Sequence, residues 1–95
     1  MEYSAMYSVS ADAICQEVSG EIVILDLKSE QYFSLDPVGT RIWQLLQEKA
    51  HLEKILTTLL AEYDVEESEL KADIKALLDK LSSEGLITML EPGRE

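Results

Sequence analysis

The stretch that decides the fold runs from Gly20 to Leu46, GEIVILDLKSEQYFSLDPVGTRIWQLL. It begins with an unbroken apolar run at 22–25 and contains a second run of aromatic and apolar residues at 32–35. Such runs are typical of β-strands, and the segment 27–29 between them indicates a turn. A strand that is apolar at every position is usually covered on both faces. Because 95 residues leave little material for a second cover, we expect a molecule outside the chain to cover one face.

The neighbouring residues extend this stretch into an antiparallel meander. A first strand is expected at 13–18, followed by a turn at Ser19-Gly20 and by strands at 21–27 and 30–35. The short separations favour antiparallel neighbours. The preceding segment is weakly patterned, so two alternatives stay open for residues 1–11: docking on the domain, or a flexible arm.

A first helix is predicted directly after the meander. Asp36 is a good N-cap residue and Pro37 is tolerated in the first helical turn. Gly39 inside this helix costs about 1 kcal/mol relative to alanine. We therefore expect a close approach of the helix to a neighbouring strand at that position.

Two further helices and a terminal strand complete the chain. Between 52 and 63 apolar residues recur at helical spacing and form one broad stripe. Asp64 and Glu67 fit an acidic variant of the capping box before the third helix, and Gly85 is suited to end that helix. A short apolar strand is expected at 86–90.

This order predicts an α+β fold in which residues 1–95 form a single domain: a three-stranded antiparallel meander, then three helices and a short terminal strand. The helices and the final strand resemble a winged helix-turn-helix. A version that reads DNA needs basic residues on its recognition helix and a wing of two strands. The third helix instead carries Asp73, Asp79 and Glu84 beside its lysines, and one wing strand is predicted. We expect the scaffold without the DNA-binding chemistry.

The net charge of the chain limits the classes of molecule that it is expected to bind. A formal net charge of −11, from 19 acidic and 8 basic residues, disfavours binding to nucleic acid or to an anionic membrane. It favours a cationic or neutral partner, or else it serves only to keep the protein in solution. No apolar run reaches the roughly 20 residues that span a bilayer, and the first residues do not form a signal segment. A cytoplasmic location is the default expectation.

Residues suited to catalysis or metal binding are scarce. Cys15 and His51 are the single cysteine and histidine of the chain. A cysteine within a strand is most often a small buried hydrophobe, and His51 stands where a solvated or capping residue is expected. One histidine and one cysteine provide no metal-ligand spacing, and the isolated glycines form no phosphate loop. We therefore expect no enzymatic activity, no metal and no cofactor.

A meander of three strands leaves an edge, and an exposed edge is a template for strand addition. The segment 31–35 contains neither a charged residue nor a proline to protect it. An extended peptide can therefore pair with it. Two alternatives remain: the apolar side chains of this segment belong only to the core, or the edge mediates homodimerisation.

The block Tyr32–Leu46 also resembles a known family. Its Y-F-x-L-D strand end, its Gly39-Thr40 step and its Ile42-Trp43 pair, followed by two helices and EGLI, are similar to the PqqD-like family of RiPP recognition elements. (RiPPs are ribosomally synthesised and post-translationally modified peptides.) Within the family the chain looks most like the stand-alone leader-binding proteins of lasso peptide biosynthesis. The resemblance implies a non-catalytic role: binding the leader of a precursor peptide and delivering it to a leader peptidase and a cyclase.

The resemblance also implies where the peptide binds. In the family the leader lies as an added strand against the third strand, beside the third helix. Carried over to this chain, the peptide-binding residues are Gln31, Tyr32, Phe33, Ser34 and Leu35 of the strand and Asp73, Ile74, Leu77 and Lys80 of the helix. The helical wheel leaves the choice of flank open. Alternative functions are a PqqD-type chaperone for a radical-SAM peptide-modifying enzyme and a winged-helix transcription regulator.

Overall fold

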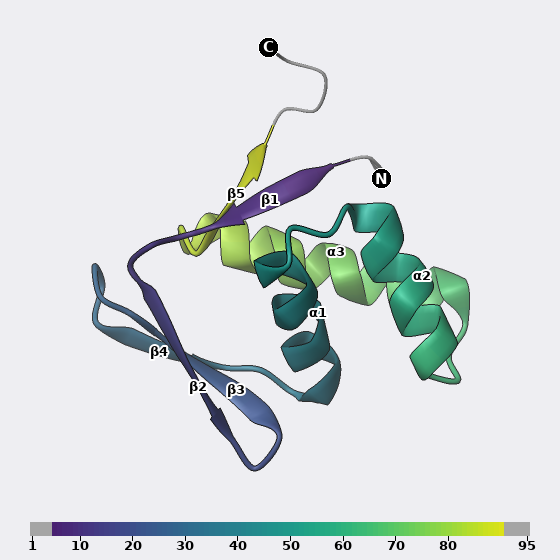
Figure 1. Ribbon diagram of the computed structural model, residues 1–95, viewed down its shortest axis with the longest axis horizontal. Helices are drawn as coiled ribbons and strands as arrows, with labels where there is room; N and C mark the ends of the chain where they lie inside the picture. The colour runs from purple at the N-terminus through teal and green to yellow at the C-terminus, as the bar shows by residue number, and fades with distance from the viewer. Residues whose placement is uncertain (1–4, 91–95) are drawn as a thin grey trace.

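The structure, a computed structural model, describes residues 5–90. It places two small sheets beside three helices (Figure 1). The predicted α+β class and the order of meander, helices and terminal strand are confirmed, with one strand more than expected. The elements are β1 Met6–Val9, β2 Ala13–Val18, β3 Glu21–Asp26, β4 Gln31–Ser34, α1 Pro37–Gln47, α2 Leu52–Glu62, α3 Glu67–Ser83 and β5 Ile87–Leu90.

The meander forms a three-stranded antiparallel sheet in the order β2-β3-β4. The turn between β2 and β3 holds Ser19 and Gly20 at positive φ, 55° and 83°. Positive φ at both central residues is the mark of a type I′ turn, whose twist suits a tight antiparallel hairpin. The predicted strands at 21–27 and 30–35 are each slightly longer than the observed β3 and β4.

The extra strand, β1, forms a second sheet with β5. The two pair antiparallel from Met6↔Leu90 to Val9↔Ile87, so the wing has two strands and the prediction of a single wing strand was wrong. Of the two alternatives for residues 1–11, docking holds for β1, while residues 1–4 lie outside the described residues. Four residues with little alternation carry too weak a pattern to be recognised before their partner strand is known.

The start of α1 follows the prediction. The Asp36 side chain accepts a hydrogen bond of 2.7 Å from the Gly39 N–H, as an N-cap should, and Pro37 occupies the first turn. A Cβ added at Gly39 would lie 3.1 Å from Asp36 Oδ1 and 3.4 Å from Leu35 Cβ. The close approach predicted for Gly39 is therefore to the residue just after β4. It brings α1 tightly against the end of that strand.

The ends of the other helices differ in part from expectation. The N-cap of α3 is Glu66, without a side-chain hydrogen bond, so the capping box predicted from Asp64 and Glu67 is wrong. Asp64 stands two residues before the cap and is out of register with the motif. His51 is the N-cap of α2 but also makes no capping hydrogen bond with its side chain. Gly85, at φ +77°, follows the end of α3 as predicted.

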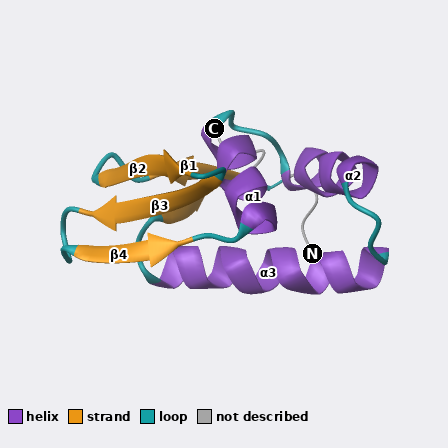
Figure 2. Cartoon of the chain, turned by 90° about the horizontal axis from the view of Figure 1, so that it is seen from below, coloured by secondary structure: helices purple, strands orange, loops and turns teal. Residues whose placement is uncertain are grey.

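One hydrophobic core joins the sheets to the helices. Ile22 and Ile24 of β3 are buried in it, whereas Val23 and Leu25, on the opposite face of the strand, are only partly buried. The chain therefore covers one face of the three-stranded sheet and leaves the other open to solvent. In Figure 2 the helices lie to one side of this sheet. No helix within residues 5–90 is long and apolar enough to cross a membrane.

Candidate functional site

The strand β4 has an open edge. It pairs with β3 only, and no other strand within residues 5–90 lies on its far side. The Leu35 N–H donates to the Ile22 carbonyl at 2.9 Å. This hydrogen bond shows which residues of β4 direct their backbone groups toward β3. In an antiparallel ladder successive residues direct their backbone groups to opposite sides. Tyr32 and Ser34 therefore direct their N–H and C=O groups toward the open edge, while Phe33 bonds to β3.

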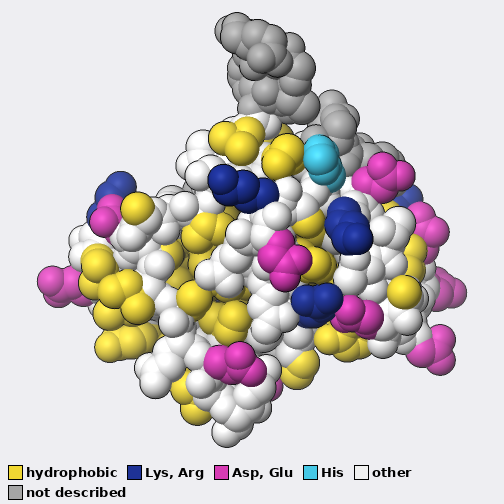
Figure 3. Space-filling view, in the orientation of Figure 1, with side chains coloured by type: hydrophobic (Ala, Val, Ile, Leu, Met, Phe, Trp, Pro, Cys, Tyr) yellow, Lys and Arg dark blue, Asp and Glu magenta, His cyan; other side chains and the backbone are white. Residues whose placement is uncertain are grey.

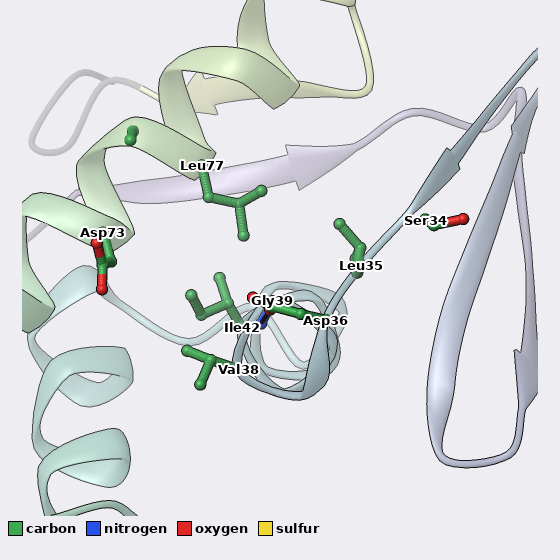
Figure 4. A pocket seen from close by; sticks show the side chains of 9 residues that line it. Ser34, Leu35, Asp36, Val38, Gly39, Ile42, Asp73 and Leu77 are labelled. Carbon is green, nitrogen blue, oxygen red and sulfur yellow. Dashed lines mark hydrogen bonds between the residues drawn. The ribbon is translucent and has the colours of Figure 1, made fainter. Parts of the chain in front are cut away.

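A hollow of about 460 Å³ lies between the end of β4, α1 and α3. Figure 4 shows Leu77 of α3 pointing toward Leu35 and Ile42, with Asp73 at one side. The residues that line the hollow are Ser34, Leu35, Asp36, Val38, Gly39, Ile42, Asp73, Ala76 and Leu77.

The structure brings together four of the nine predicted site residues at this hollow: Ser34, Leu35, Asp73 and Leu77. Gln31 lies farther along β4. Tyr32 and Phe33 are neighbours on β4 but point to opposite faces of the sheet, because side chains alternate along a strand. Phe33 packs against the core, and the Tyr32 side chain is 69% exposed.

Only part of the predicted helical half of the site lies at the hollow. Ile74 is 0% exposed, because it belongs to the apolar stripe by which α3 packs on the core, so it does not line the hollow. Lys80 is exposed but lies outside the lining as well. Ala76, which the sequence analysis did not select, does line it. The flank of α3 that faces the hollow carries Asp73, Ala76 and Leu77.

Comparison with known proteins identifies the family of this fold. Residues 21–87 match the family model described as coenzyme PQQ synthesis protein D (PqqD). The chain belongs to the PqqD family. The match runs from β3 to the start of β5 and so includes β4, α1 and α3, which surround the hollow. The predicted family resemblance is therefore confirmed.

Two solved structures are similar to this PqqD-family protein. One is described as TbiB1 in complex with the TbiA(beta) leader peptide; it is 32% identical, covers 92% of this chain and 96% of its own, and has a TM-score of 0.78. The other is described as lasso peptide synthetase B1 complexed with the leader peptide, at 24% identity, 86% and 96% coverage and a TM-score of 0.78. At that identity the second supports the fold alone. No curated protein matches the chain.

The charges at the hollow of this PqqD-family protein are acidic. Asp36 and Asp73 are the charged residues among those that line it. The Asp36 carboxylate is engaged by the Gly39 N–H as the cap of α1. Asp73, in contrast, makes no hydrogen bond or ion pair with any residue between 5 and 90. The hollow therefore combines an apolar floor with one carboxylate that lacks a partner among the described residues.

A second exposed feature of the PqqD domain is the outer face of the three-stranded sheet. Ile14, Leu25 and Tyr32 lie side by side across the three strands on this face. Ile14 and Val18 are 52% and 51% exposed, and Figure 3 shows hydrophobic side chains gathered over this end of the molecule. Exposed apolar patches on small domains commonly mark interaction surfaces.

The residues considered for catalysis are separate in the fold. Cys15 is partly buried in β2, and its Sγ accepts a hydrogen bond of 3.4 Å from Gln47 Nε2. His51 stands at the start of α2. Within residues 5–90 no three His, Cys, Asp or Glu side chains are grouped so that they could hold a metal ion. The candidate site is thus the open edge of β4 with the adjoining hollow, and not these residues.

Proposed function

We propose that this PqqD-family protein binds the leader segment of a ribosomally made precursor peptide by strand addition to β4, without catalysing a reaction itself. The observation that carries the proposal is the open edge at Tyr32 and Ser34, directly beside the hollow between α1 and α3. The similar structure at 32% identity, which is described as a complex with a leader peptide, supports it.

The two parts of the site serve different purposes in this proposal. Hydrogen bonds to the backbone of Tyr32 and Ser34 contribute about 0.5–1.5 kcal/mol each and are independent of the peptide sequence. Apolar side chains that enter the hollow contribute about 1.5–3 kcal/mol each when fully buried. Because alternate residues of an added strand face the hollow, these side chains provide the selectivity.

The opposite edge of the sheet is the competing place for strand addition. By the same alternation, β2 directs the backbone of Ala13, Cys15 and Glu17 toward its open side. Glu17 places a charge on that edge, and charged side chains protect edges from pairing. The Gln47 side chain also reaches Cys15 from α1. These features favour β4.

We further propose that the bound leader is delivered to a leader peptidase and then to a cyclase in a cytoplasmic lasso peptide pathway. The family description, which concerns coenzyme PQQ synthesis, also supports a PqqD-type chaperone for a radical-SAM enzyme. The neighbouring genes distinguish the two. A transglutaminase-like protease and an asparagine-synthetase-like cyclase indicate a lasso pathway, and a radical-SAM enzyme indicates the chaperone role.

The test of the binding mode is a titration of the purified protein with the leader encoded beside its gene, followed by calorimetry. Ser34→Pro removes an N–H from the open edge of β4 and leaves the ladder to β3 intact, since proline is tolerated at edges. We expect saturable binding to the native protein and clear weakening in Ser34→Pro. Glu17→Pro, which makes the same change on the β2 edge, is the matched control and should bind normally. Equal binding by both folded variants would exclude β4 as the site.

A further inference from the structure

The lining of the hollow points to the chemistry of the side chain that enters it. Val38, Ile42, Ala76 and Leu77 provide apolar surface, and the polar residues of the lining are Ser34, Asp36 and Asp73. Within residues 5–90, no lysine or arginine takes part in the lining. The hollow therefore presents apolar surface with negative charge and no cation of its own.

The cations nearest to Asp73 along α3 are already paired. Lys71 lies 3.1 Å from a Glu67 oxygen and Lys75 lies 2.8 Å from Asp79. Lys80 is seven residues beyond Asp73, about 10 Å along the helix axis at 1.5 Å per residue. On α1, Arg41 is bound to Glu62 at 3.0 Å. The Asp73 carboxylate thus remains without a cationic partner among residues 5–90.

A ligand with a long cationic side chain satisfies both properties of this lining. The hydrocarbon stems of lysine and arginine lie well on apolar surface, while their charged heads reach outward. Asp73 is exposed, so a neutral apolar side chain would leave its carboxylate in water and gain no contact from it. An acidic side chain would meet like charge. A basic side chain can cover Leu77 and hydrogen-bond to Asp73 at the same time.

We infer that the hollow receives a lysine or arginine side chain of the bound leader, and that Asp73 is the residue that selects it. This inference rests on the proposed function and specifies the class of peptide that the site accepts. The net charge of −11 acts in the same direction, because it attracts basic peptides before contact.

The test is selection of binders from a phage-displayed library of random peptides, carried out in parallel on the native protein and on Asp73→Lys. The matched control is Glu84→Lys, which makes the same charge change at the C-terminal end of α3, outside the lining. We expect the native protein and Glu84→Lys to enrich peptides with Lys or Arg at one fixed position. Asp73→Lys should lose that preference or enrich Asp or Glu there.

Synthetic peptides taken from the selection measure how much the pairing with Asp73 contributes to affinity. Replacing the selected basic residue by norleucine, or Asp73 by Asn, should each weaken binding roughly two- to five-fold, as for partly exposed ion pairs. The two changes together should weaken it no more than either alone. If peptides are enriched without a basic position, or Asp73→Lys selects the same residues as the native protein, the inference is wrong while the proposed function stands. If no peptide binds at all, the proposed function itself fails.

Discussion

The Thr40 hydroxyl accepts a hydrogen bond of 2.9 Å from the backbone N–H of Ile22. The same oxygen lies 3.4 Å from the Leu35 carbonyl, to which it donates. One buried side chain of α1 thereby completes the ladder between β3 and the end of β4. The wall of the hollow and the strand edge beside it are held in one geometry by this contact.

Replacing Thr40 by valine should therefore destabilise the fold. The isosteric change leaves the buried Ile22 N–H without its acceptor, which costs about 1–3 kcal/mol. Urea unfolding followed by circular dichroism measures the change. Thr40→Ser keeps the hydroxyl and should retain more of the stability than the valine variant. Equal stability of Thr40→Val and the native protein would show that the contact contributes nothing.

The cap of α1 offers a second test. Asp36→Ala removes the acceptor of the Gly39 N–H and should cost about 0.5–2 kcal/mol of unfolding free energy. Asp36→Asn retains a capping oxygen and should be close to the native protein, also measured by urea unfolding. An asparagine variant as unstable as the alanine variant would mean that the charge, and not the cap, matters at this position.

Two neighbouring positions on α3 should behave in opposite ways. Ile74→Ala opens a cavity in the core and should cost about 2–5 kcal/mol. Leu77→Ala lies at the partly exposed wall of the hollow, so it should leave stability nearly unchanged and weaken leader binding by calorimetry. The assignment of the flank would be wrong if Leu77→Ala bound the leader as tightly as the native protein.

Tyr7 of β1 provides a test at alkaline pH. Burial, and secondly the negative charge of Asp79, raise the pKa of Tyr7 above the ordinary tyrosine value of 10.0, against the opposing effect of Lys75. Because the folded state holds this proton more tightly, the associated stability is present below pH 10 and is lost as pH rises through the raised pKa. Tyr7→Phe cannot ionise.

The stability advantage of the native protein over Tyr7→Phe should therefore shrink between about pH 10 and pH 12. Urea unfolding of both proteins at each pH measures it, and the absorbance of tyrosinate provides an independent titration. A difference in stability that stays constant over this range would contradict the assigned environment of Tyr7.

The parts of the fold that the sequence predicted are those with strong local signals. The apolar stripe of α2, the cap at Asp36 and the turn at Ser19-Gly20 each depend on neighbouring residues only. The strand β1 was missed because its structure depends on pairing with β5, about 80 residues away in the chain. No pattern within four residues contains that information.

The candidate site also has one part that the sequence predicted and one part that it did not. The open strand at 31–35 followed from the order of the elements. The flank of α3 did not, since Ile74 and Leu77 are both apolar and only packing shows which of them is buried. Ala76 could not have been selected, because a small residue acquires a role only from the space that its neighbours leave.

The shortness of β4 has a consequence for any peptide that it holds. Four residues at about 3.3 Å each extend roughly 13 Å, and two of them carry the available backbone groups. A bound peptide that is longer than this span extends beyond β4 on either side. Those flanking residues stay accessible to a second protein while β4 binds the residues between them, so that binding and processing need not compete for the same part of the peptide.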